Sequence, residues 1–259
     1  MERTHGDRIS KFGVRDSGGG TAPRRIVLGM TGASGVGYGI RLLELLCKAN
    51  HKIDVVLSPA WFRVVEHELG LKRGDRDLYE FLDVCFRRLH ANYYGDNPVA
   101  SVSVDRIHDA ADFAAPIASG SYRTDAMVVA PCTTGTLGCI ASGVHRHLIH
   151  RAAEVHLKER RRLILLVRES PLSLIQLENM KRIVRAGGII QSATPHFYGE
   201  TATVGDLIDS VVRRTLDLLD AGQRRSNTDG LSPGDALSRD RQNEQFIDLG
   251  VAQGKERGR

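Results

Sequence analysis

Short, mainly apolar segments alternate along this chain with longer segments whose apolar residues recur every three or four positions. The short segments have the length of buried strands, and the longer ones have the period of amphipathic helices. Strands separated by helices predict a parallel sheet with helices on both faces. The predicted strands are 26–30, 52–57, 126–130, 162–167 and 187–190, and the predicted helices are 36–49, 60–69, 77–90, 134–143, 147–159, 173–186 and 203–220.

The predicted fold class is therefore α/β, a doubly wound parallel sheet with right-handed crossovers. The segment 70–123 holds short pieces that the pattern does not assign beyond one helix. Residues 26–220 form the predicted single domain. The predicted flexible N-terminal tail is 1–25, and the predicted polar C-terminal tail is 221–259, which we expect to be mobile, with docking of Phe246–Leu249 left open.

The net charge of +5 gives little support to nucleic-acid binding, because it is concentrated in the tails. Residues 1–25 carry six Lys/Arg against three Asp/Glu, residues 222–259 seven against six, and the body twenty-three against twenty-two. A nucleic-acid surface calls for a basic stripe on a folded element, so such a role is left open only for the tails. The sequence lacks an apolar run of the ~20 residues that span a bilayer. We expect a soluble, cytoplasmic protein.

Three loops that follow predicted strands have residues suited to an anionic ligand. They are Thr31–Gly35, Pro131–Thr136 and Arg168–Pro171. Ligands of such sheets lie at the carboxyl ends of the strands, and backbone N–H groups at a helix start favour phosphate. Each loop also has a purely structural interpretation: a tight turn for the first, simple N-capping for the second, and a salt bridge capping the next helix for the third.

Histidine and cysteine residues suggest other chemistry less strongly. His145, His147, His150 and His156 raise the question of a metal, but their spacing also fits a solvated helix face and no carboxylate or cysteine set completes a site. We expect no metal. Cys132 has no neighbouring base in the sequence and is interpreted as a packing residue.

Taken together, several blocks resemble the UbiX family of flavin prenyltransferases, over roughly 26–220. The matching blocks are Met30–Gly35 with Tyr38-Gly39, Ala118–Ser121, Ala130–Leu137, Leu148–Arg161, Leu166–Ser173, Leu177–Met180 and Pro195–Tyr198. The resemblance implies a flavodoxin-like (Rossmann-like) fold and a homododecamer with active sites at subunit interfaces. It implies that a dimethylallyl group passes from dimethylallyl phosphate to N5 and C6 of reduced FMN without a metal. The prenylated FMN would then serve a UbiD-type decarboxylase.

The resemblance also implies roles for individual residues. The expected catalytic residues are Ser34, Glu68 and Glu169. The expected flavin-binding residues are Gly32, Ala33, Ser34, Ser58, Thr133, Thr134, Gly135, Thr136 and Arg168. The expected substrate-binding residues are Arg151 from a neighbouring subunit, Lys158, Tyr198, Arg214, Phe113 and Ser119.

The chain departs from the family pattern at a few positions. Phe113 stands where the family commonly has a tryptophan, Thr133 replaces a common serine, and Pro59 replaces a residue that is often lysine. Two other functions stay open. One is a non-catalytic FMN-holding subunit of an aromatic-acid decarboxylase complex. The other is a peptidyl-cysteine type FMN-dependent decarboxylase, which the absence of a histidine in the first turn disfavours.

Overall fold

The computed structural model describes residues 23–95, 104–197 and 203–221. The chain divides into a unit that runs to Leu216 and a second that begins at Asp217. The tail predictions for 1–25 and 221–259 fall almost entirely outside the described residues. The strands are β1 (Arg25–Met30), β2 (Lys52–Leu57), β3 (Arg106–His108), β4 (Ala126–Cys132), β5 (Arg162–Val167) and β6 (Ile189–Ser192). The helices are α2 (Val36–Lys48), α3 (Pro59–Leu69), α4 (Leu78–Tyr93), η1 (Pro116–Ala118), α5 (Thr134–Ala141), α6 (Leu148–Lys158), α7 (Leu174–Arg185) and α8 (Val204–Asp220).

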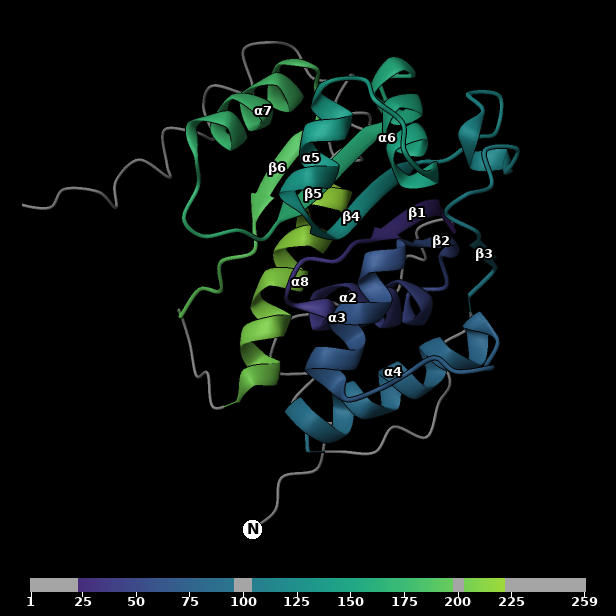
Figure 1. Ribbon diagram of the computed structural model, residues 1–259, viewed down its shortest axis with the longest axis vertical. Helices are drawn as coiled ribbons and strands as arrows, with labels where there is room; N and C mark the ends of the chain where they lie inside the picture. The colour runs from purple at the N-terminus through teal and green to yellow at the C-terminus, as the bar shows by residue number, and fades with distance from the viewer. Residues whose placement is uncertain (1–22, 96–103, 198–202, 222–259) are drawn as a thin grey trace, which may run out of the picture. The chain divides into compact units, whose positions relative to one another are not determined.

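The strands of the described chain form one parallel sheet in the order β3-β2-β1-β4-β5-β6 (Figure 1). This order, 3-2-1-4-5-6, is the Rossmann arrangement within the doubly wound class. The predicted fold class is confirmed. After β1 the chain builds outward through β2 and β3, and it then returns to place β4 on the other side of β1. The β1/β4 boundary is therefore the switch point, where the loops at the carboxyl ends diverge and leave room for a ligand.

Each face of the sheet is covered by helices, as Figure 1 shows, with α5, α6 and α7 on one side and α2, α3, α4 and α8 on the other. Successive strand residues point to opposite faces. Val27, Met127 and Leu165 accordingly join the core beneath α5 and α6, whereas Gln191 on β6 turns to the other face and donates to the Val211 carbonyl of α8 at 3.1 Å.

Several elements differ from the sequence prediction, among them β6, which spans Ile189–Ser192 rather than 187–190, and η1, which was not predicted. β4 continues past residue 130 to Cys132, through a register irregularity against β5 between Val129 and Cys132. β3 was not predicted, because three residues are too few to show a period and this edge strand carries Arg106 and His108 rather than an apolar run.

Candidate active site

A buried threonine joins the two loops at the switch point. Thr31, 1% exposed, follows β1. Its hydroxyl donates to the Pro131 carbonyl at 2.7 Å and accepts from the Thr133 N–H at 2.9 Å. Its own N–H also donates to the Pro131 carbonyl, at 3.2 Å. The first and second predicted flavin loops are therefore fixed to each other by one side chain.

The amino end of α2 is bound by a carboxylate from α3. Gly35, at φ 97°, takes the left-handed conformation that glycine adopts readily, and it supplies no side chain to cap the helix. Glu68 takes that place. Its Oε1 accepts from the Gly35 N–H at 2.8 Å, and its Oε2 accepts from the Val36 N–H at 3.0 Å. The exposed Ser34 lies beside this carboxylate, and both residues line a hollow of about 340 Å³ together with Tyr38 and Ile208.

The three threonines of the second loop make two kinds of contact. Thr133 is the N-cap of α5, with its hydroxyl oxygen accepting from the Thr136 N–H at 3.0 Å, and it also bonds the Thr136 hydroxyl at 2.9 Å. Thr134 turns instead toward the third loop, where its hydroxyl donates to Glu169 Oε2 at 3.4 Å. Capping therefore explains Thr133 and Thr136 but not Thr134.

The third loop exposes Arg168 and Glu169 directly after β5. Glu169 Oε1 accepts from the Ser170 N–H at 3.0 Å. The salt-bridge interpretation of this loop is wrong, because α7 is capped by Ser173 in a capping box with Gln176. Burial raises the pKa of the Tyr38 phenol, and the nearby positive charge of Arg168 opposes that rise. The first turn of α2, which follows the first loop, is therefore close enough to the third loop for the charge of Arg168 to act on it.

The second strand also ends in a capping residue. Ser58 is 4% exposed, and its hydroxyl oxygen accepts from the Trp61 N–H at 3.3 Å at the start of α3. Gly32 meets this helix closely, because an added Cβ would lie 2.5 Å from that of Ala60. We call the following set the carboxyl-edge group: Gly32, Ala33, Ser34, Ser58, Glu68, Thr133, Thr134, Gly135, Thr136, Arg168 and Glu169.

Other predicted residues gather along α6. Arg151 Nε donates to the Ala118 carbonyl at 3.0 Å, and its guanidinium also pairs with Glu154. Lys158 pairs with Glu159 at the end of the helix, close to Gly120, where an added Cβ would lie 2.9 Å from Lys158 Nζ. Ser119 lies between these two contacts and hydrogen-bonds Ser121 at 2.8 Å. We call Ser119, Arg151 and Lys158 the α6 group.

The two groups do not meet within one chain. Lys158 precedes the amino end of β5, whereas Arg168 and Glu169 follow its carboxyl end. Six strand residues separate them, which at ~3.3 Å per residue amounts to about 20 Å. Arg214 is exposed on α8, on the opposite face of the sheet from α6 (Figure 1). Phe113 is 47% exposed in the segment before η1. Tyr198 lies outside the described residues.

Two of the four histidines and Cys132 lie in the interior, whereas His145 and His147 are half-buried. His150 and His156 are 3% and 1% exposed, so the solvated-face interpretation is wrong for these two. Burial lowers the pKa of each to about 4. Among the described residues, no group of three or more His, Cys, Asp or Glu side chains is arranged to hold a metal ion. Cys132 is fully buried, which raises the pKa of its thiol, as expected for a packing residue.

Sequence reasoning missed the roles of Thr31 and Tyr38, although both lie in quoted blocks. Thr31 is a hydroxyl residue directly before a glycine-rich turn, and this position was the sequence signal that could have indicated its role. Within the described parts of the chain, no helix is long and apolar enough to cross a membrane.

These features define a doubly wound α/β protein with a composite polar site at its switch point, and the comparisons agree. A family model described as Flavoprotein matches residues 16–216. The flavin prenyltransferase UbiX of Pseudomonas aeruginosa is 41% identical over 201 residues, which cover 77% of this chain and 90% of that protein. The chain belongs to the UbiX family of flavin prenyltransferases.

Solved structures give the same assignment. The crystal structure of AnUbiX (PadA1) in complex with FMN and dimethylallyl pyrophosphate matches with a TM-score of 0.64 and 39% identity, over 76% of this chain and 93% of that one. A dodecameric FMN-dependent UbiX-like decarboxylase from Escherichia coli O157:H7 matches with a TM-score of 0.62 and 37% identity, over 74% of this chain and 93% of that one.

Proposed function

We propose that this chain joins a dimethylallyl group from dimethylallyl phosphate to N5 and C6 of reduced FMN. The observation that carries the proposal is the carboxyl-edge group of a UbiX family member, where Thr31 and Glu169 connect the three strand-end loops and Glu68 fixes the first loop to α3. FMN supplies the two ring atoms that form the new bonds. The loop hydroxyls and helix amino ends around it are donors suited to a flavin phosphate and ring carbonyls.

We further propose that the α6 group of a second copy completes the site. Arg151 and Lys158 supply two cations, and Lys158 lies a strand length, about 20 Å, from Glu169 in its own chain. A phosphate leaving group needs cations beside it as the C–O bond breaks. The dodecameric relative supports an assembly in which another subunit brings those cations to the carboxyl edge. Arg214 and Tyr198 are proposed to join them.

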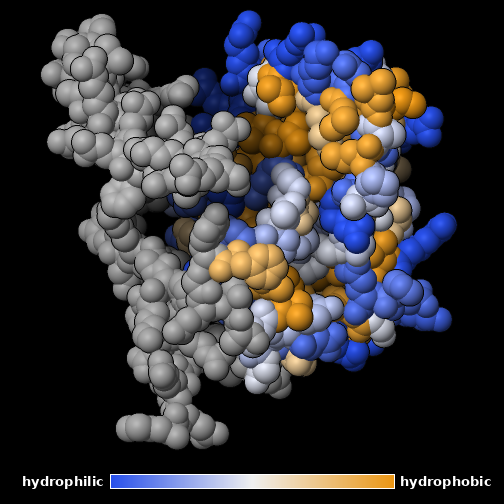
Figure 2. All heavy atoms as spheres, turned by 90° about the vertical axis from the view of Figure 1, so that its left-hand side faces the viewer, coloured by the Kyte–Doolittle hydropathy of each residue, from blue (hydrophilic) through white to orange (hydrophobic). Residues whose placement is uncertain are grey.

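The start of α7 is suited to receive that second copy. Leu174 and Ile175 are 74% and 75% exposed directly after the Glu169 loop, with Leu172 and Leu177 beside them. Figure 2 looks onto this side of the molecule and shows apolar atoms grouped near its upper edge. Exposed apolar patches of this kind mark interaction sites, and this one adjoins the incomplete site.

Glu169 is the proposed acid and base of the reaction. Its carboxyl group gives a proton to the phosphate that departs as the N5–carbon bond forms. A proton then adds to the double bond of the attached prenyl group, and the carboxylate accepts the proton that leaves C6 as the carbon–carbon bond forms. Ser34 is proposed to relay a proton beside N5, from its place in the hollow with Glu68. Phe113 and Ser119 are proposed to shape the prenyl pocket, with the phenyl ring facing the developing allyl cation.

The transferase is tested by mixing the protein anaerobically with reduced FMN and dimethylallyl phosphate and extracting the flavin for mass spectrometry. A flavin heavier by one dimethylallyl unit is the expected result. Unmodified flavin, with the diphosphate also tried and FMN still bound, would favour the FMN-holding subunit instead. The E169Q variant should bind FMN normally and form less of the cyclised product. Delivery of the product to a UbiD-type decarboxylase and a cytoplasmic location stay predictions.

A further inference from the structure

A buried arginine on α2 joins that helix to α8. Arg41 is 9% exposed. Its Nε donates to Asp209 Oδ1 at 2.7 Å and its Nη2 donates to Asp209 Oδ2 at 3.1 Å, so the guanidinium and the carboxylate form a two-pronged ion pair. Because Asp209 belongs to α8, this pair connects two helices that are far apart in sequence and adjacent in the fold (Figure 1).

The ion pair is held in turn by residues of α2 and α4. Glu44, one turn further along α2 and 2% exposed, accepts from Arg41 Nη1 and also bonds His90 Nε2 at 3.0 Å. The Tyr94 hydroxyl donates to Asp209 Oδ1 at 2.8 Å, and the Arg41 guanidinium lies over the Tyr94 ring, 4.8 Å from its centroid. Burial alone would raise the pKa of Glu44, but its hydrogen bonds to His90 and Arg41 outweigh it and hold that pKa at about 2. Glu44 is therefore charged and keeps the guanidinium in place.

An apolar contact could attach α8 as firmly as this ion pair does. Replacing a buried ion pair by apolar side chains is often neutral or stabilising, since each charge loses its hydration. What a two-pronged pair adds is one fixed orientation of the two side chains. The presence of Arg41 and Asp209 between α2 and α8 therefore indicates that the position of α8 matters, and not only its attachment.

The start of α8 forms part of the site. Ile208, next to Asp209, lines the hollow of about 340 Å³ that contains Ser34. The walls of this hollow also include the amino end of α2 and Tyr93 at the end of α4. Gly205 lets α8 approach closely, because an added Cβ would lie 2.7 Å from the Tyr93 carbonyl oxygen. The ion-pair network thus joins three of the helices that enclose the hollow.

The next turn of α8 lies beside the carboxyl edge of the sheet. The Gln191 side chain donates to the Val211 carbonyl at 3.1 Å and accepts from the Thr215 hydroxyl at 3.0 Å. Gln191 is the last residue but one of β6. The exposed Arg214 belongs to the turn that these two bonds hold, so its backbone lies at the edge where the site loops gather.

We propose that Arg41 and Asp209 are positioning residues for Arg214, which they hold, through α8, where it binds the phosphate of the prenyl donor. The inference rests on the proposed function, which assigns Arg214 to that phosphate. Neither positioning residue is expected to touch a substrate, because their side chains are 11% and 13% exposed and bond each other. Their effect should therefore appear in donor binding and should depend on Arg214.

The test measures the KM for dimethylallyl phosphate at saturating FMN, together with FMN affinity by fluorescence titration. D209N and R41K each lose the two-pronged geometry. Each should raise the donor KM roughly tenfold, the usual scale for one charge-assisted hydrogen bond, and leave FMN affinity unchanged. R214M should raise the donor KM at least as much. In the R214M background neither D209N nor R41K should raise it further, since the residue that they position is gone.

Arg25→Met is the matched control. It removes a guanidinium from another buried carboxylate, that of Asp54, which keeps its bond to His108 at 2.8 Å. This variant should be less stable than the wild type and keep the wild-type donor KM. If D209N or R41K fails to fold, the double variant R41M/D209M replaces both charges by apolar side chains. That exchange should retain the fold without the fixed orientation, and the donor KM should still be raised.

The outcomes separate the inference from the function on which it rests. A wild-type donor KM in folded D209N and R41K, losses that add to that of R214M, or an equal rise in Arg25→Met would overturn the inference alone. A fall in FMN affinity as large as the rise in donor KM would do the same. A wild-type donor KM in R214M would overturn the assignment of Arg214 and the inference with it. A wild-type chain that transfers no prenyl group would overturn the proposed function.

Discussion

Glu68 of α3 accepts the Gly35 N–H at 2.8 Å and so caps a helix other than its own. The contact brings a full negative charge to the amino end of α2, where the helix dipole favours it. It also holds the turn that carries Ser34. The resemblance assigned Glu68 to the catalytic set, and the geometry adds a positioning task that can be measured without turnover.

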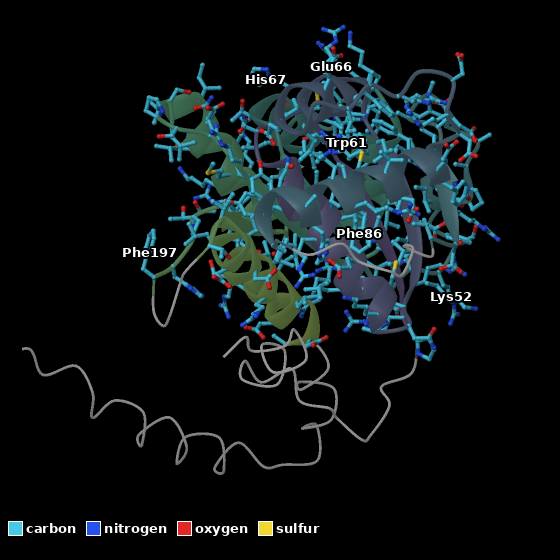
Figure 3. All side chains as sticks on the ribbon, turned by 90° about the horizontal axis from the view of Figure 1, so that it is seen from below. Lys52, Trp61, Glu66, His67, Phe86 and Phe197 are labelled. Atoms are coloured by element: carbon cyan, nitrogen blue, oxygen red, sulfur yellow. The ribbon has the colours of Figure 1, made fainter. Side chains whose placement is uncertain are left out.

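Replacing Glu68 by Ala should lower the free energy of unfolding by about 1–2 kcal/mol, since helix N-caps contribute that much. FMN affinity should fall too, because the Ser34 turn loses its anchor. Chemical denaturation and FMN titration measure the two effects. Glu66→Ala is the matched control, since Glu66 lies two residues away and points outward (Figure 3). Equal effects of the two substitutions would contradict the capping role.

Thr31 offers a test of the link between the first two loops. Thr31→Val keeps the volume and removes the hydroxyl, which leaves the Thr133 N–H without its acceptor. An unpaired buried donor costs about 1–3 kcal/mol, so we expect that loss of stability together with weaker FMN binding. Thr31→Ser keeps the hydroxyl and should restore both. A Val variant with wild-type FMN affinity would show that the loops hold their positions without this residue.

The sequence predicted most of the sheet because its strands are buried on both faces and read as mainly apolar runs, even where β2 carries the buried Asp54. The parallel arrangement then placed the ends of β1, β4 and β5 at one edge, so the three site loops were predicted as well. β3 was not predicted because an edge strand of three residues is too short to show a periodic pattern.

Tertiary contacts account for what the sequence did not predict. The Glu68 carboxylate reaches Gly35 across two helices, and the Asp54–His108 pair joins two strands far apart in sequence. No local pattern encodes either contact. The spacing of His156 and the other histidines was compatible with a solvent-exposed helix face. In the structure α6 packs against the sheet and the η1 segment, and the His156 ring faces inward.

The buried His156 predicts a loss of stability in mild acid. Burial holds its pKa at about 4, well below the ordinary 6.5, while Nδ1 donates to the Ala152 carbonyl at 2.7 Å and Nε2 bonds the Thr124 hydroxyl at 2.9 Å. Below pH 6.5 His156 becomes protonated in the unfolded chain but stays neutral in the folded chain. The neutral His156 side chain therefore makes its full contribution to the free energy of unfolding above pH 6.5. That contribution, up to about 3 kcal/mol, is lost as the pH falls toward about 4.

Denaturation of the FMN-free protein at pH 7 and pH 5 measures this effect. His156→Gln should flatten the pH dependence, because glutamine does not titrate, whereas the exposed His67→Gln should not. His150 has the same shift and should account for part of the slope that persists in the single variant. A wild-type slope retained in a double His150/His156 variant would rule out this origin.

The separation of Lys158 from Glu169 predicts that two damaged chains repair each other. K158A and E169Q should each form little of the cyclised product alone, because every site then lacks either Lys158 or Glu169. Dissociating, mixing and reassembling them should restore activity at roughly a quarter of the interfaces, where intact halves from different copies meet in a heterologous contact. Lys52→Ala, which removes an outward-pointing lysine (Figure 3), should stay active and leave the mixing result unchanged. If the site lay within one chain, mixtures of K158A and E169Q would stay as inactive as the separate variants, because no single chain would carry both residues.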